Sequence, residues 1–372
     1  MFPSSQKAFV LIMTLWMIAI ITIGVGFFAL WTERTLEIAL SMQEDLQGEI
    51  DMQATEANLL FLLATQPFTI AGMTMPSFKM QDKTKTLDEL MDEMIENMKK
   101  NKNLSNLDNE STYSILPVGG ELRLDDRPYF GQGKAFFALQ DEGGLLSLNT
   151  AEEKVIDRFL GLLGVDEKMR PTLVAKLQDY MDTDDLHRLN GAEKNHYENL
   201  NLPLPTNHFL LHPMQSKLVM DWTDQPEIWA DQKLLQLTNK NLSTIPNFNT
   251  APALVLQAAY GITADAAEQL VRLRESNPFY RLDSVWQVTG TFEIDQLYTN
   301  FFPIRHLRLT LWYANGKKMR QVHLQLTHDI DEFKPWRVLY TTETALLPIY
   351  KEKIPHYAKT TFFTPAIPTT PQ

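Results

Sequence analysis

FVLIMTLWMIAIITIGVGFFALW, residues 9–31, contains no charged side chain. A helix of this length spans roughly 35 Å at 1.5 Å per residue, enough to cross a bilayer core of about 30 Å. Trp31 stands at its far end, where aromatic side chains commonly anchor membrane helices. The stretch therefore predicts a membrane-spanning helix. A buried helix of a soluble protein is the weaker alternative, because uncharged apolar runs of this length usually span membranes.

A cleaved secretory signal peptide is a second alternative for this stretch. The apolar core of such a peptide is about 7–15 residues long, and small residues follow it. Here the run is longer and continues into Thr32, Glu33 and Arg34. We therefore expect the helix to be retained as an anchor. Lys7 and the amino terminus are the positive charges that precede it, which favours a cytoplasmic N-terminus and an exported body.

The helical pattern continues beyond the apolar stretch. From Leu36 onward, apolar residues recur in steps of three and four, which marks one face of a helix. Gly48 is the one weak point, and Pro67 ends the pattern. The sequence thus predicts one helix from Phe9 to Gln66, about 87 Å long, whose second half lies against a protein core. The apolar positions of that half are Leu36, Ala39, Met42, Leu46, Ile50, Ala54, Ala57, Phe61 and Ala64.

Length, composition and charge narrow the class of protein. The chain has 372 residues, a net charge of −12 and no cysteine. The length leaves room for about two domains. The acidic balance argues against a nucleic-acid partner, because such proteins usually show a basic stripe. The lack of cysteine excludes disulfides, thiolate metal sites and cysteine nucleophiles.

The order of predicted elements after the long helix indicates an α+β fold. A short helix is expected at 87–100 and strands at 113–118, 120–124 and 133–139, followed by a mainly helical block from Ala151 to Trp286. Strands return at 306–312, 319–326 and 336–342, with the hairpin signal Asn315-Gly316 between the first two. We therefore expect a long N-terminal helix packed on an antiparallel sheet, with a large inserted helical domain. The proline-containing tail from Ile354 to Gln372 is expected to be extended or disordered.

An acidic segment lies inside the helical block. Calcium takes six to eight oxygen ligands from flexible carboxylates and carbonyls, which such a segment can supply. The spacing does not follow the EF-hand pattern, so a solvated acidic loop is the competing interpretation. Asp141 and Glu142 form a second acidic pair that could fold back to the same region. The candidate calcium ligands are Asp179, Asp182, Asp184, Asp185 and Glu193.

Two other functions have weaker support in the sequence. Gly261-Ile262-Thr263 joins two predicted helices and resembles a helix-hairpin-helix module for DNA, although threonine stands where a second glycine is usual. Arg272, Arg274 and Arg281 are the basic residues nearby, and acidic residues offset them. An enzyme would need a catalytic constellation, and no histidine pair has metal-ligand spacing such as H-E-x-x-H. We therefore expect no enzymatic activity and no bound nucleic acid.

Several segments carry a family resemblance. Ala8 followed by FVLIMTLW resembles a type IV prepilin-like N-terminus. Three further segments are similar to the K-type minor pseudopilin of type II secretion, and so is the hairpin after Phe302. The segments are ALQDEGGLLSLNT (138–150), LQDYMDTDDLHRLNGAEKNHY (177–197) and FNTAPALVLQAAYGITADAAEQLVRLRE (248–275).

The resemblance implies a structural function. Such proteins sit at the tip of a periplasmic pseudopilus, contact the I- and J-type minor pseudopilins and start fibre assembly. Relatives bind calcium in a helical domain inserted into a pilin-type core, which favours calcium as the ligand of the acidic segment. A minor pilin of a type IV pilus is the alternative in the same class.

The resemblance also implies processing by prepilin peptidase between Ala8 and Phe9. That peptidase usually cuts after glycine, and this chain has alanine there. Most pilins carry a glutamate five residues into the mature chain, where this chain has Met13; K-type relatives also lack the glutamate. The implied order is a leader (1–8), a transmembrane helix (9–31) in the inner membrane, a pilin-like core in the periplasm (32–150), the helical insert (151–290), the rest of the core (291–345) and a tail (346–372).

Overall fold

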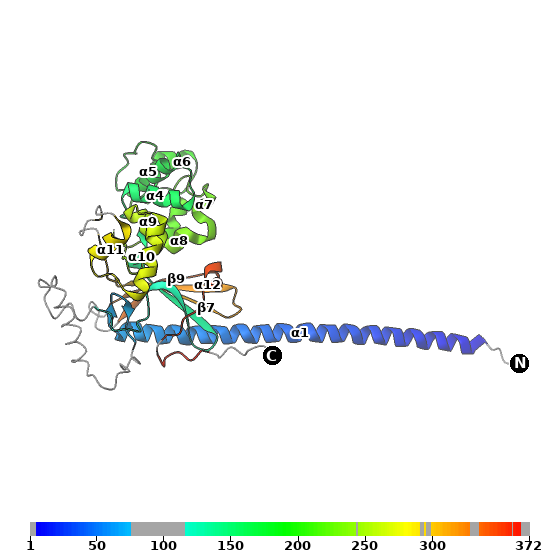
Figure 1. The fold of residues 1–372 in the computed structure, drawn as a ribbon. Coiled ribbons are helices and arrows are strands. Elements are labelled where there is room, and N and C mark those ends of the chain that lie inside the picture. Colours follow the sequence, from blue (N-terminus) through cyan, green and yellow to red (C-terminus); the bar gives the residue numbers. More distant parts are fainter. Residues whose placement is uncertain are drawn as a thin grey trace, which may run out of the picture.

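A long helix dominates the computed structural model, which describes residues 5–75, 116–242, 245–290, 294, 299–327, 335–358 and 360–365 (Figure 1). Helix α1 runs from Ser5 to Thr65, close to the predicted range, and is roughly 92 Å long. Its described side chains up to Gln47 are almost all exposed. Within the described residues, Val10–Thr65 is long and apolar enough to cross a membrane: its most apolar window has a mean hydropathy of 2.4 and is unburied.

The second half of α1 packs against an antiparallel sheet. The sheet has the strand order β3-β4-β7-β8-β9, and each strand is antiparallel to its neighbour. Gly48 lies where the helix crosses β7, because a Cβ at this position would come within 2.5 Å of the Tyr313 ring. The weak point in the helical pattern is therefore a close contact. The strands are β3 (Asp125–Phe130), β4 (Ala135–Asp141), β7 (His306–Tyr313), β8 (Lys318–Leu326) and β9 (Trp336–Ala345).

Alternation along β7 separates two packed layers. Leu307, Leu309 and Leu311 join the core beneath α1, together with Leu59 and Phe137. The residues between them face the other side of the sheet, where the helical part of the chain lies (Figure 1). This period of two is the one that the sequence showed. The predicted α+β architecture, with a long helix on an antiparallel sheet and further helices, is confirmed.

The helical part has its own hydrophobic core. Trp222, Phe159, Phe248 and Tyr180 are fully buried there, among residues from 146 to 294. The division of the chain at 151 and 290 stays a prediction. The helices are α4 (Glu153–Leu163), α5 (Arg170–Met181), α6 (Lys194–Asn199), α7 (Pro226–Trp229), α8 (Lys233–Leu237), α9 (Ala253–Tyr260), α10 (Ala264–Ser276) and α11 (Leu282–Thr289), with short 3₁₀ turns η1 (Glu142–Gly144), η2 (Pro213–Leu218) and η3 (Ala230–Gln232). Two-residue strands pair as β1 (Phe68–Thr69) with β2 (Gly72–Met73) and β5 (Leu146–Ser147) with β6 (Thr238–Asn239).

Several local predictions differ from the structure. The strand expected at 120–124 is a single bridge between Leu122 and Met73. The real neighbouring strand is β3, which the sequence DDRPYF does not suggest, because it combines charges with a proline. The helical block, expected from Ala151, begins with α4 at Glu153, which has no side-chain cap. The helix at 87–100 and most of the strand at 113–118 lie outside the described residues.

The described part of the tail, residues 354–358 and 360–365, contacts both the sheet and α1. After β9 comes α12 (Pro348–Glu352), and the chain then passes along β3 and α1. The Phe130 N–H donates to the His356 carbonyl at 2.9 Å, and the Asn58 amide donates to the Phe362 carbonyl at 2.9 Å. Phe363 is buried against Phe137. The described residues of the tail thus cover the β3 edge of the sheet.

Candidate metal centre

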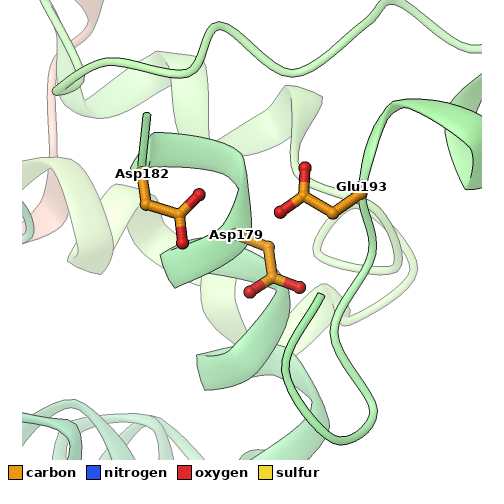
Figure 2. Close-up of side chains that lie close together, drawn as sticks. All are labelled: Asp179, Asp182 and Glu193. Atoms are coloured by element: carbon orange, nitrogen blue, oxygen red, sulfur yellow. The ribbon is translucent and has the colours of Figure 1, made fainter. Parts of the chain in front are cut away.

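Three acidic side chains meet at the end of α5. Asp179 lies in the last turn of that helix, Asp182 directly follows it, and Glu193 directly precedes α6. One oxygen atom from each of the three carboxylates lies within 4.8 Å of the other two. Figure 2 shows the three side chains close together, with Asp179 between Asp182 and Glu193. The end of α5 and the start of α6 thus bring the three carboxylates together.

Burial leaves part of this group without hydrogen-bond partners. Asp179 is fully buried and Glu193 is 3% exposed. Asp179 accepts hydrogen bonds from the backbone N–H and the guanidinium of Arg188, which also pairs with Asp182. Among the described residues, both oxygens of Glu193 and one oxygen of Asp182 have no donor. Buried carboxylate oxygens without donors are costly, so these atoms are suited to a cation.

The electrostatics of the group favour a dication. Burial and the nearby charges of Asp179 and Asp182 raise the pKa of Glu193 to about 7. Arg188 supplies one positive charge against three carboxylates. Gly191 is also fixed by this site, since a Cβ there would come within 1.9 Å of an Asp179 oxygen. The three carboxylates offer up to six oxygens, a donor set that fits calcium.

The other two predicted ligands lie outside this group. Asp184 and Asp185 are exposed in the loop after α5. The Asp184 carboxylate accepts from the Leu186 N–H at 2.8 Å, which is a local turn contact. Both aspartates still contribute negative charge that raises the pKa of Glu193. Burial and chain direction therefore separate the three residues that lie together from the two exposed ones, and the predicted calcium site stays a prediction.

Asp141 is part of a different site from the acidic group. It is fully buried at the end of β4 and accepts four hydrogen bonds. The donors are the N–H groups of Gly143 and Ile304, the amide of Asn247 and the hydroxyl of Thr250, at 2.8–3.0 Å. Burial raises the pKa of Asp141 to about 6 although these bonds oppose the rise. Asp141 thus joins the sheet to the segments that precede α9 and β7.

Glu142 also connects the sheet to the helical part. Its carboxylate accepts from the Asn241 amide at 2.7 Å and lies 2.6 Å from Nδ1 of His323 on β8. Arg308 on β7 is 1% exposed, and its guanidinium donates to the Gln236 carbonyl at 3.0 Å. The sequence did not predict this function of Asp141 and Glu142. The one feature of the sequence that could have indicated it is that the two acidic residues directly follow a predicted strand.

Internal contacts hold the hairpin that resembles a helix-hairpin-helix module. Gly261 ends α9 in the left-handed conformation, and Thr263 caps α10 by accepting from the Ala266 N–H. Arg274 is 2% exposed and donates to the carbonyls of Phe248 and Ala251 at 3.0 and 2.6 Å. This guanidinium is directed into the protein, where it cannot contact a phosphate.

Comparisons with known proteins gave two family matches and a match among solved structures. Two family models, both described as Type II secretion system (T2SS), protein K, match residues 135–238 and 246–299. Among solved structures, the chain is similar to one chain in the crystal structure of the GspK-GspI-GspJ complex from the type 2 secretion system of enterotoxigenic Escherichia coli. That match has 15% sequence identity and a TM-score of 0.45, and it covers 58% of this chain and 83% of that chain. No curated protein sequence matches the chain.

Proposed function

Since the chain belongs to the protein K family of the type II secretion system, and is thus a minor pseudopilin, we propose that it caps the pseudopilus tip and initiates its assembly. The observation that carries this proposal is the division of α1. Its first half is apolar and exposed, and its second half is covered by the sheet. A helix built in this way can hold a folded body above a membrane and remain available to neighbouring helices.

We propose that residues 9–31 lie in the inner membrane and that the body is periplasmic. The uncharged sequence and its exposed side chains support this placement. Prepilin peptidase would cut between Ala8 and Phe9, which both lie within α1 of the uncut chain. The mature protein would then begin at the start of the apolar stretch.

The segment of α1 between the membrane and the body supports a helix-packing function. Leu36, Met42 and Leu46 are 59–68% exposed, although their apolar spacing predicted that they face a protein core. Neighbouring subunits of the same assembly would cover such side chains. We propose the I- and J-type minor pseudopilins as these neighbours, as the family resemblance implies.

The helical part supports a position at the tip. It covers the face of the sheet that α1 leaves open, so it adds bulk beside the long helix (Figure 1). Bulk of this kind would block a further subunit from stacking above this one. Growth would then proceed only from the membrane side.

Deletion of residues 151–290 tests the blocking function. We expect the shortened protein to enter the fibre along its length, because the obstructing helices are gone. Immunogold labelling of sheared pseudopili, with the full chain as the reference, measures the position. Labels confined to one end for both proteins would contradict the proposal, provided that the shortened chain is present in the fibres.

We further propose that Asp179, Asp182 and Glu193 hold calcium. The dication would neutralise their charge and satisfy the unpaired oxygens of Glu193 and Asp182. It would thereby fix the loop between α5 and α6. Arg188 would position the two aspartates through its hydrogen bonds.

Calcium is expected to raise the thermal midpoint of the protein by several degrees over a chelator, through binding to the folded state alone. Glu193→Gln should remove this response. Glu198→Gln is the matched control, because Glu198 is an exposed glutamate whose partner is Lys194. Differential scanning calorimetry at pH 7.5 makes the measurement. An equal calcium response in both variants would exclude the site.

The calcium response should also weaken at acidic pH. The pKa of Glu193 is raised to about 7, so protons compete with calcium for its carboxylate as the pH falls through that value. The shift of the thermal midpoint is therefore expected to be smaller at pH 5.5 than at pH 8. A response that is independent of pH would place the ion elsewhere.

A further inference from the structure

The two edges of the central sheet differ in how they are covered. The chain's own tail runs along β3: the His356 N–H donates to the Pro128 carbonyl at 2.9 Å and the Gly133 N–H to the Thr364 carbonyl at 3.0 Å. Strand β9 forms the opposite edge. In the described part of the chain, the backbone groups of 336–345 pair only with β8. One edge is therefore satisfied internally, whereas the other still presents unpaired N–H and C=O groups.

Strand β9 is a long edge strand whose charged residues are Arg337 and Glu343 and whose pairing with β8 shifts register between His323 and Leu324. Proteins commonly guard such edges with proline, lysine or a very short strand. The sequence of β9 is WRVLYTTETA, ten residues with neither proline nor lysine. Val338 is 46% exposed, and most of the other side chains are exposed or half-buried. A strand of this kind can accept a further strand.

An uncharged apolar loop lies beside this edge. Residues 199–216 contain no aspartate, glutamate, lysine or arginine. The Asn149 side chain accepts from the Leu210 N–H at 2.8 Å and donates to the Leu210 carbonyl at 3.0 Å, which holds Leu210 inside the protein. Phe209 and Leu211, on either side, are 50% and 63% exposed. Their exposure is therefore imposed by a fixed backbone.

Aromatic contacts hold the loop against the strand. The His212 ring meets the edge of Tyr340 on β9 with centroids 4.5 Å apart. Tyr340 in turn stacks on His323 of β8 at 4.1 Å. The loop that carries the exposed Phe209 and Leu211 thus contacts β9 through His212.

We propose that the outer edge of β9, together with Phe209 and Leu211, binds an extended, uncharged and apolar segment of a partner protein as a sixth strand. The free backbone groups require an extended polypeptide, because a lipid chain offers them no hydrogen bonds. The absence of charge in the loop favours an apolar partner segment and disfavours nucleic acid, whose backbone requires cations. Side chains on one face of the added strand would contact the loop.

A strand-forming peptide tests this proposal. The probe is a fluorescein-labelled ten-residue peptide of alternating valine and threonine, titrated into the full-length protein in detergent by fluorescence anisotropy. The control peptide has the same sequence but is N-methylated at its four central residues, so that its backbone cannot donate hydrogen bonds there from either edge. We expect the control peptide to bind at least tenfold more weakly. The plain peptide should also slow hydrogen exchange at 336–345.

Matched variants locate the site. Phe209→Ser combined with Leu211→Ser should weaken peptide binding about tenfold, whereas Leu273→Ser, at another exposed leucine, should not. Equal binding of the two peptides, or slowed exchange elsewhere than 336–345, would overturn the proposal. Self-association through β9 in analytical ultracentrifugation would also overturn the proposal, because the occupant would then be a second copy of the chain. Adsorption of the loop to neutral lipid vesicles that the peptide does not affect would overturn it as well.

Discussion

Asp141→Ala is expected to destabilise the protein by about 3–5 kcal/mol, because four buried donors lose one acceptor. Those donors come from segments that are far apart in the sequence, so the change loosens the attachment of the helices to the sheet. The thermal midpoint should fall by roughly 10 °C. Thermal unfolding of the full-length protein in detergent, followed by circular dichroism, measures the change.

Asp184→Ala is the control for this prediction. Asp184 is also an aspartate, but it is exposed and accepts only a local bond from Leu186. We expect the thermal midpoint of the Asp184→Ala variant to equal that of the unmodified protein. Equal midpoints for the two variants would show that Asp141 does not join the two parts of the protein.

Arg274→Ala is expected to produce a loss of similar size. The Arg274 guanidinium is buried and donates to two carbonyls, and removing it leaves both without that donor. Burial lowers its pKa to about 10 although Asp125 opposes the shift, so the group remains charged at neutral pH. We expect a loss of about 3 kcal/mol, measured by denaturant unfolding.

Arg272 provides a control on the same helix. It is exposed and reaches only Glu268, four residues earlier, at 3.4 Å. Arg272→Ala should leave the unfolding midpoint unchanged. In a DNA-binding hairpin, the exposed Arg272 would contact the DNA, so its substitution would reduce DNA binding. Salt-dependent binding of DNA that is lost in Arg272→Ala would therefore contradict the structural interpretation.

The features that the sequence predicted best are those with strong local patterns. Residues 9–66 have a helical period, and α1 follows it to within a few residues at each end. Alternation and Asn315-Gly316 similarly predicted β7 and β8, which pair as a hairpin. For β7 and β8 the alternation also reports which face is buried. For α1 the predicted face is wrong: Leu36, Ile50 and Phe61 are exposed, and Met52, Leu59 and Leu62 lie against the sheet instead. Tertiary contacts then reinforce the local preference.

The missed features depend on contacts between distant segments. Strand β3 has a proline and three charged residues, and it is a strand because Asp125 pairs with Arg123 and Arg127 while β4 and the tail lie beside it. The function of Asp141 likewise requires Asn247 and Ile304, more than a hundred residues away. A single sequence contains no local signal for such partners.

The sequence predicted the candidate metal centre only in part. The density of acidic residues predicted the segment, and Asp179, Asp182 and Glu193 do converge. Local spacing could not separate them from Asp184 and Asp185, because convergence depends on where α5 ends and where α6 begins. Whether calcium binds stays a prediction for the calorimetry described above.

The central claim, that this chain is a processed and membrane-anchored minor pseudopilin, is tested most directly by its N-terminal mass. The protein would be extracted from membranes of cells with and without prepilin peptidase and analysed by intact mass spectrometry. We predict a mature chain that begins at Phe9 only when the peptidase is present. A chain that keeps Met1 in both cases, or one that is cut near Thr32, would contradict the account.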